Sequence, residues 1–267
     1  MANTVTAPCT VRKAAADIEL PAESEGKGMI DLHSHLLYSV DDGAETLDDS
    51  LALARVAVDD GIRAMALTPH IHPGRYSNIR SELEGKVRTF QRELDEHAIP
   101  LRVMLGGEVR LSIESLELIL EGEVPFLGTV DGYRIMLLEF PHQMIPVGSQ
   151  QFVDKLLEMK IRPLIAHPER NKAIMAQPDR IHPFLDAGCW LQLTAGSIAG
   201  RFGEVSRKTA HSFLTEGWAH VIASDAHNMD HRPPILSEAR DVVTTLLGEK
   251  KAWQLLRERP AQILGLA

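Results

Sequence analysis

From residue 29 onward, the chain alternates short apolar runs with longer amphipathic segments. Short apolar runs bounded by polar residues predict buried strands, and apolar residues spaced three or four apart predict helices. Strands are predicted within residues 29–35, 64–70, 101–108, 134–139, 162–167, 190–194 and 220–225. Helices are predicted between and after them, at residues 47–60, 81–97, 113–121, 150–160, 178–187, 204–216, 234–247 and 249–257, with a last turn from Pro260.

The first helix has the clearest boundaries. Thr46 is a suitable N-cap and Gly61 a suitable stop, and Leu47, Leu51, Ala54 and Val58 give one apolar face. About seven strand–helix units follow one another without an internal repeat. Regular alternation of this kind indicates a mainly parallel sheet. We therefore expect an α/β fold, in the form of a distorted (β/α)7 barrel of the TIM type.

The length of 267 residues suits one large barrel domain, expected over residues 29–267. Residues 1–28 carry no apolar stretch typical of a secretory signal, and their acidic residues argue against a transit peptide. We expect them to form a disordered N-terminal extension. Translation from Met1 and from Met29 both remain open.

Composition narrows the function classes. The net charge of −9 disfavours a generic nucleic-acid-binding protein, which would usually be basic. No apolar stretch approaches the ~20 residues of a membrane span, so no membrane insertion is expected. The two cysteines, Cys9 and Cys189, imply no disulfide framework, and a reducing cytoplasm is expected. A homo-oligomer remains open.

Six of the apolar runs are followed directly by imidazole or carboxylate side chains. These residues are His33, His35, His70, Glu108, Glu139, His167, Asp225 and His227. Because parallel strands of a barrel end at one face, we expect these side chains to meet there in a polynuclear metal site. A mixture of imidazole and carboxylate without thiolate favours Mn²⁺, Fe²⁺, Co²⁺ or Zn²⁺.

Spacing adds detail to this site. His33 and His35 are two apart on a predicted strand, so both side chains should point the same way, and Asp225 and His227 repeat this spacing. The segment Asp41-Asp42-Gly43 is either a plain turn or the source of another carboxylate ligand. With it, about nine ligands would suffice for three ions if one carboxylate bridges two of them.

Arg170 and Arg232 each follow a candidate ligand closely, and arginine suits bidentate recognition of phosphate. The remaining histidines are not expected in the site, although His142 is the least secure exclusion because it follows Glu139. These excluded residues are His72, His97, His142, His182, His211, His220 and His231. The chain contains no Cys-x5-Arg loop, Walker motif or G-x-S-x-G motif, so nucleophilic cysteine, P-loop and serine mechanisms lack support.

Taken together, the motifs resemble those of the PHP (polymerase and histidinol phosphatase) superfamily. Within it, the chain closely resembles bacterial protein-tyrosine phosphatases of capsule and exopolysaccharide operons. The motifs are Asp31-Leu-His-Ser-His35, Asp41-Asp42-Gly43-Ala44, Thr68-Pro-His70, Gly107-Glu108, Leu138-Glu139-Phe140, Ala166-His-Pro-Glu-Arg170, Gln192-Leu-Thr-Ala-Gly-Ser197, Gly200-Arg-Phe-Gly203, Ala223-Ser-Asp-Ala-His-Asn228 and Arg232-Pro-Pro234. The resemblance covers residues 29–266.

The resemblance implies a distorted seven-unit barrel, the PHP fold, with three divalent ions that are usually Mn²⁺. It implies hydrolysis of phosphotyrosine by a hydroxide formed on the ions, on an autokinase that controls capsule or exopolysaccharide assembly. The implied ligand sets are His33, His35, Glu108 and Asp225 for one ion, Glu108, Glu139 and His167 for a second, and Asp42, His70 and His227 for a third. Arg170 and Arg232 would bind the phosphate.

Two alternatives remain at this point. One is a small-molecule phosphomonoesterase such as a histidinol-phosphate phosphatase, whose alkoxide leaving group is far more basic than a phenol of pKa ~10. The other is a non-catalytic module that docks on a kinase, which loss of ligands would indicate. No candidate ligand of the resemblance is lost in this sequence.

Overall fold

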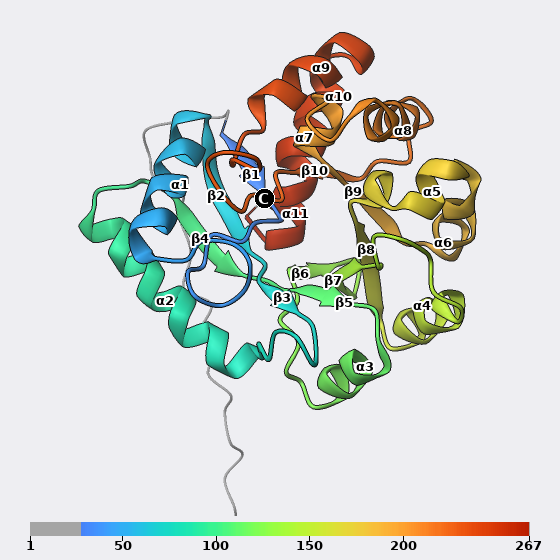
Figure 1. The fold of residues 1–267 in the computed structure, drawn as a ribbon, viewed down its shortest axis with the longest axis horizontal. Coiled ribbons are helices and arrows are strands. Elements are labelled where there is room, and N and C mark those ends of the chain that lie inside the picture. The colour runs from blue at the N-terminus through green and yellow to red at the C-terminus, as the bar shows by residue number, and fades with distance from the viewer. Residues whose placement is uncertain (1–27, 267) are drawn as a thin grey trace, which may run out of the picture.

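The computed structural model describes residues 28–266, so the expected disordered extension lies, apart from Gly28, outside the described residues. The strands are β1 (Met29–Asp31), β2 (Ile62–Leu67), β3 (His70–Ile71), β4 (Arg102–Leu105), β5 (Glu108–Arg110), β6 (Gly128–Val130), β7 (Tyr133–Glu139), β8 (Ile161–Ala166), β9 (Trp190–Thr194) and β10 (Val221–Ala223). They lie in the middle of the molecule, and helices surround them (Figure 1).

The α-helices mostly follow strands, as the sequence pattern predicts. They are α1 (Leu47–Asp59), α2 (Arg80–Glu96), α3 (Ile113–Leu120), α4 (Ser149–Glu158), α5 (Lys172–Ala176), α6 (His182–Ala187), α7 (Ala195–Ile198), α8 (Glu204–Thr215), α9 (Ser237–Leu247), α10 (Glu249–Trp253) and α11 (Arg259–Leu264). Three short helical segments of other types are η1 (Pro168–Arg170), η2 (Pro178–Ile181) and η3 (Gln254–Glu258).

The strands form an α/β fold with two mainly parallel sheets, which confirms the expected fold class. One sheet has the order β1-β2-β4, and the other has the order β10-β9-β8-β7-β5-β3. A single parallel bridge between Ser34 and Ala226 joins them on one side. The barrel is therefore distorted, because its hydrogen-bonded ladder is divided into two sheets.

On the other side, the chain itself joins the two sheets. β2 leads into β3 through Thr68-Pro69, and β4 leads into β5 through Gly106-Gly107. A Cβ atom on Gly106 would lie 2.7 Å from Leu127 Cδ2, so the bend packs too closely for a larger residue. Both bends deliver a candidate ligand, because His70 opens β3 and is paired with Glu108, which opens β5.

The antiparallel hairpin of β6 and β7 was not predicted. Its turn is Asp131-Gly132, and both residues have positive φ, at 52° and 77°. Positive φ at both central residues defines a type I′ turn, for which Asp-Gly is a preferred sequence. The dipeptide was therefore the signal in the sequence that should have indicated the hairpin.

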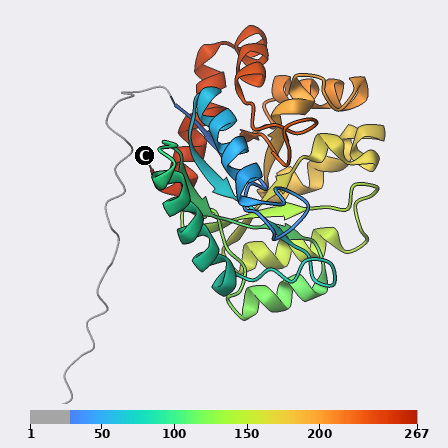
Figure 2. The ribbon, with the colours of Figure 1, turned by 60° about the vertical axis from the view of Figure 1, so that its left-hand side comes forward.

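Helix α1 forms where expected and for the expected reason. Thr46 accepts a hydrogen bond from the backbone N–H of Asp49, whose side chain accepts one from the Thr46 backbone, so the two residues form a capping box. Its buried face includes Leu51 and Ala54 as predicted, together with Leu53 and Ala57. Helices α1 and α2 lie side by side along one flank of the molecule (Figure 2).

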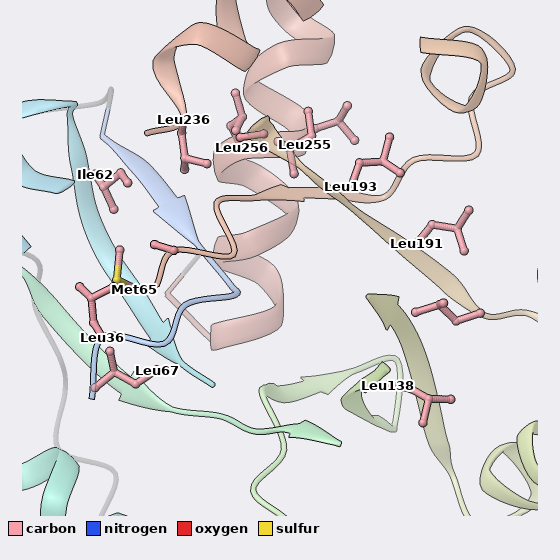
Figure 3. Packing of buried hydrophobic residues seen from close by; sticks show 14 of the residues in the cluster. Leu36, Ile62, Met65, Leu67, Leu138, Leu191, Leu193, Leu236, Leu255 and Leu256 are labelled. Atoms are coloured by element: carbon pink, nitrogen blue, oxygen red, sulfur yellow. The ribbon is translucent and has the colours of Figure 1, made fainter. Parts of the chain in front are cut away.

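The apolar core has two parts. The inner part fills the barrel with alternate strand residues such as Ile30, Leu137 and Leu164, and Ala261 and Ile263 of α11 belong to the same cluster. The outer part lies between strands and helices; Figure 3 shows some of it, from β2, β9, η3 and the neighbouring segments. α11 packs on the strands β6 and β1.

No helix within residues 28–266 has both the length and the apolar character needed to cross a membrane.

Candidate metal centre

Apart from Asp42, the candidate ligands gather near the carboxyl ends of β1, β2, β4, β7, β8 and β10, as predicted, but several lie beyond the last residue of the strand. β1 ends at Asp31, so His33 and His35 lie on the extended segment after the strand and not on it. Their side chains nevertheless converge, with Nε2 atoms 3.2 Å apart. Asp225 likewise lies two residues beyond β10.

Glu108 lies at the centre of this group. Its Oε1 atom is 3.4 Å from His33 Nε2 and 2.9 Å from His167 Nε2. Its Oε2 atom is 3.4 Å from His35 Nε2 and 2.9 Å from His70 Nδ1. Only 1% of Glu108 is exposed. One buried carboxylate therefore contacts four imidazoles that come from three separate parts of the chain.

A second carboxylate, Asp225, lies beside the same imidazoles. Its Oδ1 atom is 3.3 Å from His33 Nε2 and 3.6 Å from His35 Nε2. Its other oxygen, Oδ2, accepts a hydrogen bond from Arg170 and lies 3.8 Å from Arg232 Nη1. Both predicted phosphate-binding arginines therefore reach the edge of the candidate metal centre.

The two aspartates of the Asp41-Asp42-Gly43 segment have different contacts. Asp42 Oδ1 lies 3.2 Å from His70 Nε2 and 3.6 Å from His227 Nε2, beside the residues predicted to share its ion. Asp41 instead accepts from His35 Nδ1 at 2.7 Å and from the backbone N–H of His70. Asp41 thus orients the His35 ring and holds the backbone of His70, while Asp42 lies beside the His70 and His227 rings.

Three sets of side chains have ligand atoms within 4.8 Å of one another. The sets are His35, Asp42, His70 and His227; His33, His35 and Glu108; and His70, Glu108 and Glu139. These sets share most members with the sets that the resemblance implies, with two differences. His35 is added to the set of Asp42, His70 and His227. In the set of Glu108 and Glu139, His70 stands in place of His167. His167 and Asp225 lie next to the second set, through Glu108 and His33.

The donor chemistry of these sets fits divalent cations. Three buried atoms, His70 Nδ1, Glu108 Oε2 and His227 Nε2, form no hydrogen bond of suitable geometry within the described chain, although the first two lie 2.9 Å apart. Leaving such atoms unpaired is costly in a protein interior unless another group binds them. A metal ion bound by these atoms would remove that cost.

The electrostatics of the imidazoles support the same conclusion. Burial would lower the pKa of His35, but the charge of Asp41 and its hydrogen bond raise it to about 9. Burial also opposes protonation of His70, yet the charge of Glu108 is the largest of the effects that raise its pKa, to about 11. Carboxylates that favour a proton on these rings would equally favour a metal cation beside them. Burial lowers the pKa of His167 to about 4, which keeps this ring neutral for coordination.

Two candidate ligands have an unusual backbone. His167 has φ 34° and ψ 50°, and Asp225 has φ 54°, so both lie in the left-handed region that glycine adopts most easily. Backbone strain of this kind is concentrated at functional sites. With this backbone, His167 contacts Glu108 and Asp225 contacts His33.

Further side chains hold the ligands from outside, and sequence reasoning gave them no such role. Gln192 Oε1 lies 2.9 Å from His33 Nδ1, which leaves the Nε2 atom of that ring toward the centre. Asp31 accepts from the backbone N–H and the hydroxyl of Ser224, next to Asp225. Partners of this kind fix ring orientation at metal sites. Gln192 belongs to one of the motifs that carry the resemblance. Asp31 and Ser224 are 193 residues apart in the sequence, so their contact could not be predicted from local pattern.

The group opens into a cavity of ≈ 260 Å³. Its walls include most of the candidate ligands together with residues from five other segments: His72, Arg75, Arg110, His142, Arg170 and Arg232. The exclusion of His72 and His142 was therefore wrong as regards position, because both line the cavity. His142 Nε2 lies 3.9 Å from Glu139 Oε1. The other excluded histidines do not line it.

Arg110 also contacts a candidate ligand, and the sequence did not indicate this contact. It is paired with Glu139 across the neighbouring strands β5 and β7, and its Nη1 atom lies 2.9 Å from Glu139 Oε2. Burial and the nearby charge of Glu108 raise the pKa of Glu139 to about 7, and Arg110 offsets part of that effect. Arg110 therefore holds one oxygen of Glu139 and favours the ionised form of this carboxylate.

Replacing Arg110 with methionine is expected to weaken binding of Mn²⁺ by about 10-fold, because loss of an outer partner of a metal ligand typically costs 10–100-fold in affinity. Titration of the metal-free protein with Mn²⁺, followed by calorimetry, measures the change. Arg134→Met is a suitable control, since Arg134 is exposed at the start of β7, away from the cavity. Equal Mn²⁺ affinity in the Arg110 variant and the parent would contradict the role assigned to Arg110.

Comparison with known proteins identifies the family. A family model described as "Capsular polysaccharide synthesis, CpsB/CapC" matches residues 29–265. Tyrosine-protein phosphatase YwqE of Bacillus subtilis (strain 168) is 34% identical over 228 residues, which cover 85% of this chain and 88% of YwqE. The family model spans the whole region that carries the candidate ligands.

Solved structures agree with this result. One, described as "Crystal structures of YwqE from Bacillus subtilis and CpsB from Streptococcus pneumoniae, unique metal-dependent tyrosine phosphatases", has a TM-score of 0.82 and 32% identity, covering 89% of this chain and 95% of that chain. The phosphotriesterase homology protein of Escherichia coli has a TM-score of 0.58 at 14% identity, covering 89% and 98%, and this likeness concerns the fold alone. Because the family model matches nearly all of the described residues, the chain belongs to the CpsB/CapC family of capsular polysaccharide synthesis.

Proposed function

We propose that the protein is a metal-dependent tyrosine phosphatase that hydrolyses phosphotyrosine in proteins. One observation carries the proposal: imidazoles and carboxylates from separate strand ends converge on Glu108, with two arginines beside them at Asp225. The relatives YwqE and CpsB, which share this family, are named as tyrosine-protein phosphatases.

We propose nine residues as metal ligands for three divalent ions, with Mn²⁺ favoured and Fe²⁺, Co²⁺ or Zn²⁺ as alternatives. They are His33, His35, Asp42, His70, Glu108, Glu139, His167, Asp225 and His227. When bound, such ions supply Lewis acidity and generate a nucleophile from water near neutral pH. Among the residues of the chain, Asp41, Arg110 and Gln192 would keep the ligands in place.

Arg170 and Arg232 are proposed to bind the phosphoryl group. The Arg170 guanidinium carbon lies 4.2 Å from the centre of the Phe202 ring, and this contact holds the side chain over the cavity. Each guanidinium has five N–H donors, so contact with Asp225 leaves others for phosphoryl oxygens. Their positive charge would also stabilise the charge that develops on these oxygens during transfer.

Aryl phosphates suit this site better than alkyl phosphates. A phenol has a pKa of ~10, so a tyrosine leaving group needs little help from a general acid. Apart from candidate ligands, the described residues lining the cavity are arginines and histidines, and the pKa of both His72 and His142 is lowered by burial. A neutral imidazole is a poor proton donor, so this cavity offers an alkoxide leaving group little assistance.

The test is release of inorganic phosphate from a phosphotyrosine peptide by the full chain loaded with Mn²⁺. We expect turnover that is lost on chelation, and slower turnover of phosphoserine peptide and histidinol phosphate. Preference for histidinol phosphate would favour the small-molecule phosphatase instead. Absence of turnover on all three, in protein shown by elemental analysis to hold metal, would favour a non-catalytic docking module.

The physiological substrate is proposed to be a bacterial tyrosine autokinase that controls capsule or exopolysaccharide assembly in the cytoplasm. Support comes from the description of the family, which assigns it to capsular polysaccharide synthesis. The experiment is dephosphorylation of such an autokinase, purified in its phosphorylated form, by this protein. Retention of phosphotyrosine on the kinase, under conditions that hydrolyse a phosphopeptide, would contradict the assignment.

Replacing Gly43 with alanine is expected to lower kcat/KM by about 10², the cost of displacing a reacting group by about 1 Å. A Cβ atom on Gly43 would lie only 2.0 Å from the carbonyl oxygen of His35, so the neighbouring Asp42 must move. Steady-state kinetics with a phosphotyrosine peptide measure the loss. Gly85→Ala is the control, because a Cβ atom there meets only the end of Arg88 at 3.9 Å. Parent activity in the Gly43 variant would show that this turn does not fix Asp42.

A further inference from the structure

A tight turn forms one edge of the cavity. It runs from His72 to Tyr76, and the backbone N–H groups of Arg75 and Tyr76 both donate to the carbonyl of His72, at 2.9 and 2.8 Å. Pro73 and Gly74 occupy its middle, and Gly74 has φ 83°, a conformation that glycine adopts without strain. The turn is therefore a defined structure that presents Arg75 at a fixed place.

Planar side chains connect this turn to the metal centre. The ring of Tyr76 stacks on the ring of His70, with centroids 5.5 Å apart and planes 9° from parallel. The guanidinium carbon of Arg75 lies in turn 5.0 Å from the centre of the Tyr76 ring. Asn78 donates to the carbonyl groups of His70 and Val40, which fixes the base of the turn. Arg75 is thus positioned relative to a candidate ligand.

Arg75 differs from the other arginines of the cavity. Arg110, Arg170 and Arg232 all contact carboxylates of the centre. Arg75 lines the same cavity and is exposed, yet it forms no ion pair with any residue in 28–266. A positive charge without a carboxylate partner, next to the substrate cavity of a chain with net charge −9, is available to a ligand from solution.

We propose that Arg75 is a specificity-determining residue that binds an acidic side chain close to the phosphotyrosine in the substrate protein. The inference rests on the proposed function, since it names the sequence context of the same substrate. A guanidinium held by a turn and by ring stacking loses little freedom when it forms paired hydrogen bonds to a carboxylate. The negative charge of the rest of the chain would repel an acidic segment, so this contact would decide where such a segment docks.

The test uses three phosphotyrosine peptides of equal length with aspartate, alanine or lysine at the positions flanking phosphotyrosine. We expect the parent protein to have the highest kcat/KM for the aspartate peptide. Arg75→Gln should reduce kcat/KM for that peptide by about 5-fold, mainly through KM, since an exposed ion pair contributes up to about fivefold. Arg75→Glu should reverse the order, so that the lysine peptide becomes the best of the three.

A matched control separates contact from overall charge. Arg55→Gln removes the same charge from an exposed position in the middle of α1 that does not line the cavity. Equal effects of the Arg55 and Arg75 variants, or equal parent rates on the three peptides, would overturn the inference. Free phosphotyrosine serves as the reference substrate. If free phosphotyrosine is hydrolysed and the three peptides are hydrolysed at equal rates, this inference alone is overturned. If neither free phosphotyrosine nor any of the three peptides is hydrolysed, the proposed function is overturned as well.

Discussion

Replacing Glu108 with glutamine is expected to lower kcat/KM for a phosphotyrosine peptide by more than about 10³, together with loss of bound metal. Removing one group that stabilises transition-state charge typically costs about 10²–10³. Glu108 should exceed this, because its two oxygens contact four imidazoles and belong to two of the three candidate ligand sets. Glutamine keeps the volume of the side chain but removes its negative charge, so the ions lose attraction and the core keeps its packing.

Two measurements are needed for this variant: elemental analysis of the purified protein and steady-state kinetics with added Mn²⁺. Glu117→Gln on the exposed side of α3 controls for the loss of one negative charge. A Glu108→Gln protein with the full metal content and the parent rate would show that Glu108 is a buried structural carboxylate and not a ligand.

Replacing Arg170 or Arg232 with alanine should separate catalysis from metal binding. Each variant is expected to keep a near-normal metal content and to lose about 10²–10³ in kcat/KM, the usual cost of one donor that stabilises developing charge. The guanidinium groups would bind phosphoryl oxygens more strongly as charge spreads over them, so kcat should fall as well as kcat/KM. Arg170 should have the larger effect, because Phe202 holds it in place.

Arg201→Ala is the control for both variants. Arg201 precedes Phe202, is exposed, and pairs with Glu238 on α9, so its loss removes the same charge without touching the cavity. If Arg170→Ala and Arg232→Ala both hydrolysed the peptide at the parent rate, the phosphate would have to bind elsewhere in the cavity. The proposed metal ligands would not be affected by that result.

Apart from Asp42, the candidate ligands could be found in the sequence because each lies at or shortly after the end of an apolar run, and such runs are a regular signal in an α/β chain. Periodicity gives the end of a strand only to within a few residues, however. It placed His33 and His35 on a strand that in fact ends at Asp31. It also gives no sign that the chain bends at Thr68-Pro69 and at Gly106-Gly107. At the second bend, close packing against Leu127 and Ile71 leaves no room for larger residues.

Contacts between distant segments could not be predicted in the same way. Arg110 meets Glu139 only because β5 and β7 pair in one particular register, and register is set by the whole sheet. His72 and His142 were excluded because neither ends an apolar run, yet loops carry both to the cavity wall. For the hairpin of β6 and β7 a signal is present in the sequence, in Asp131-Gly132.

The left-handed backbone at His167 and Asp225 bears on attempts to make this protein more durable. A side chain in that conformation costs about 1 kcal/mol relative to glycine, so glycine at either position would relieve the backbone. A selection for survival at high temperature, without a requirement for turnover, would therefore tend to replace two of the proposed metal ligands. Thermostable variants obtained in this way should be sequenced first at these two positions. A substitution there that raises the melting temperature is expected to lower the phosphatase activity.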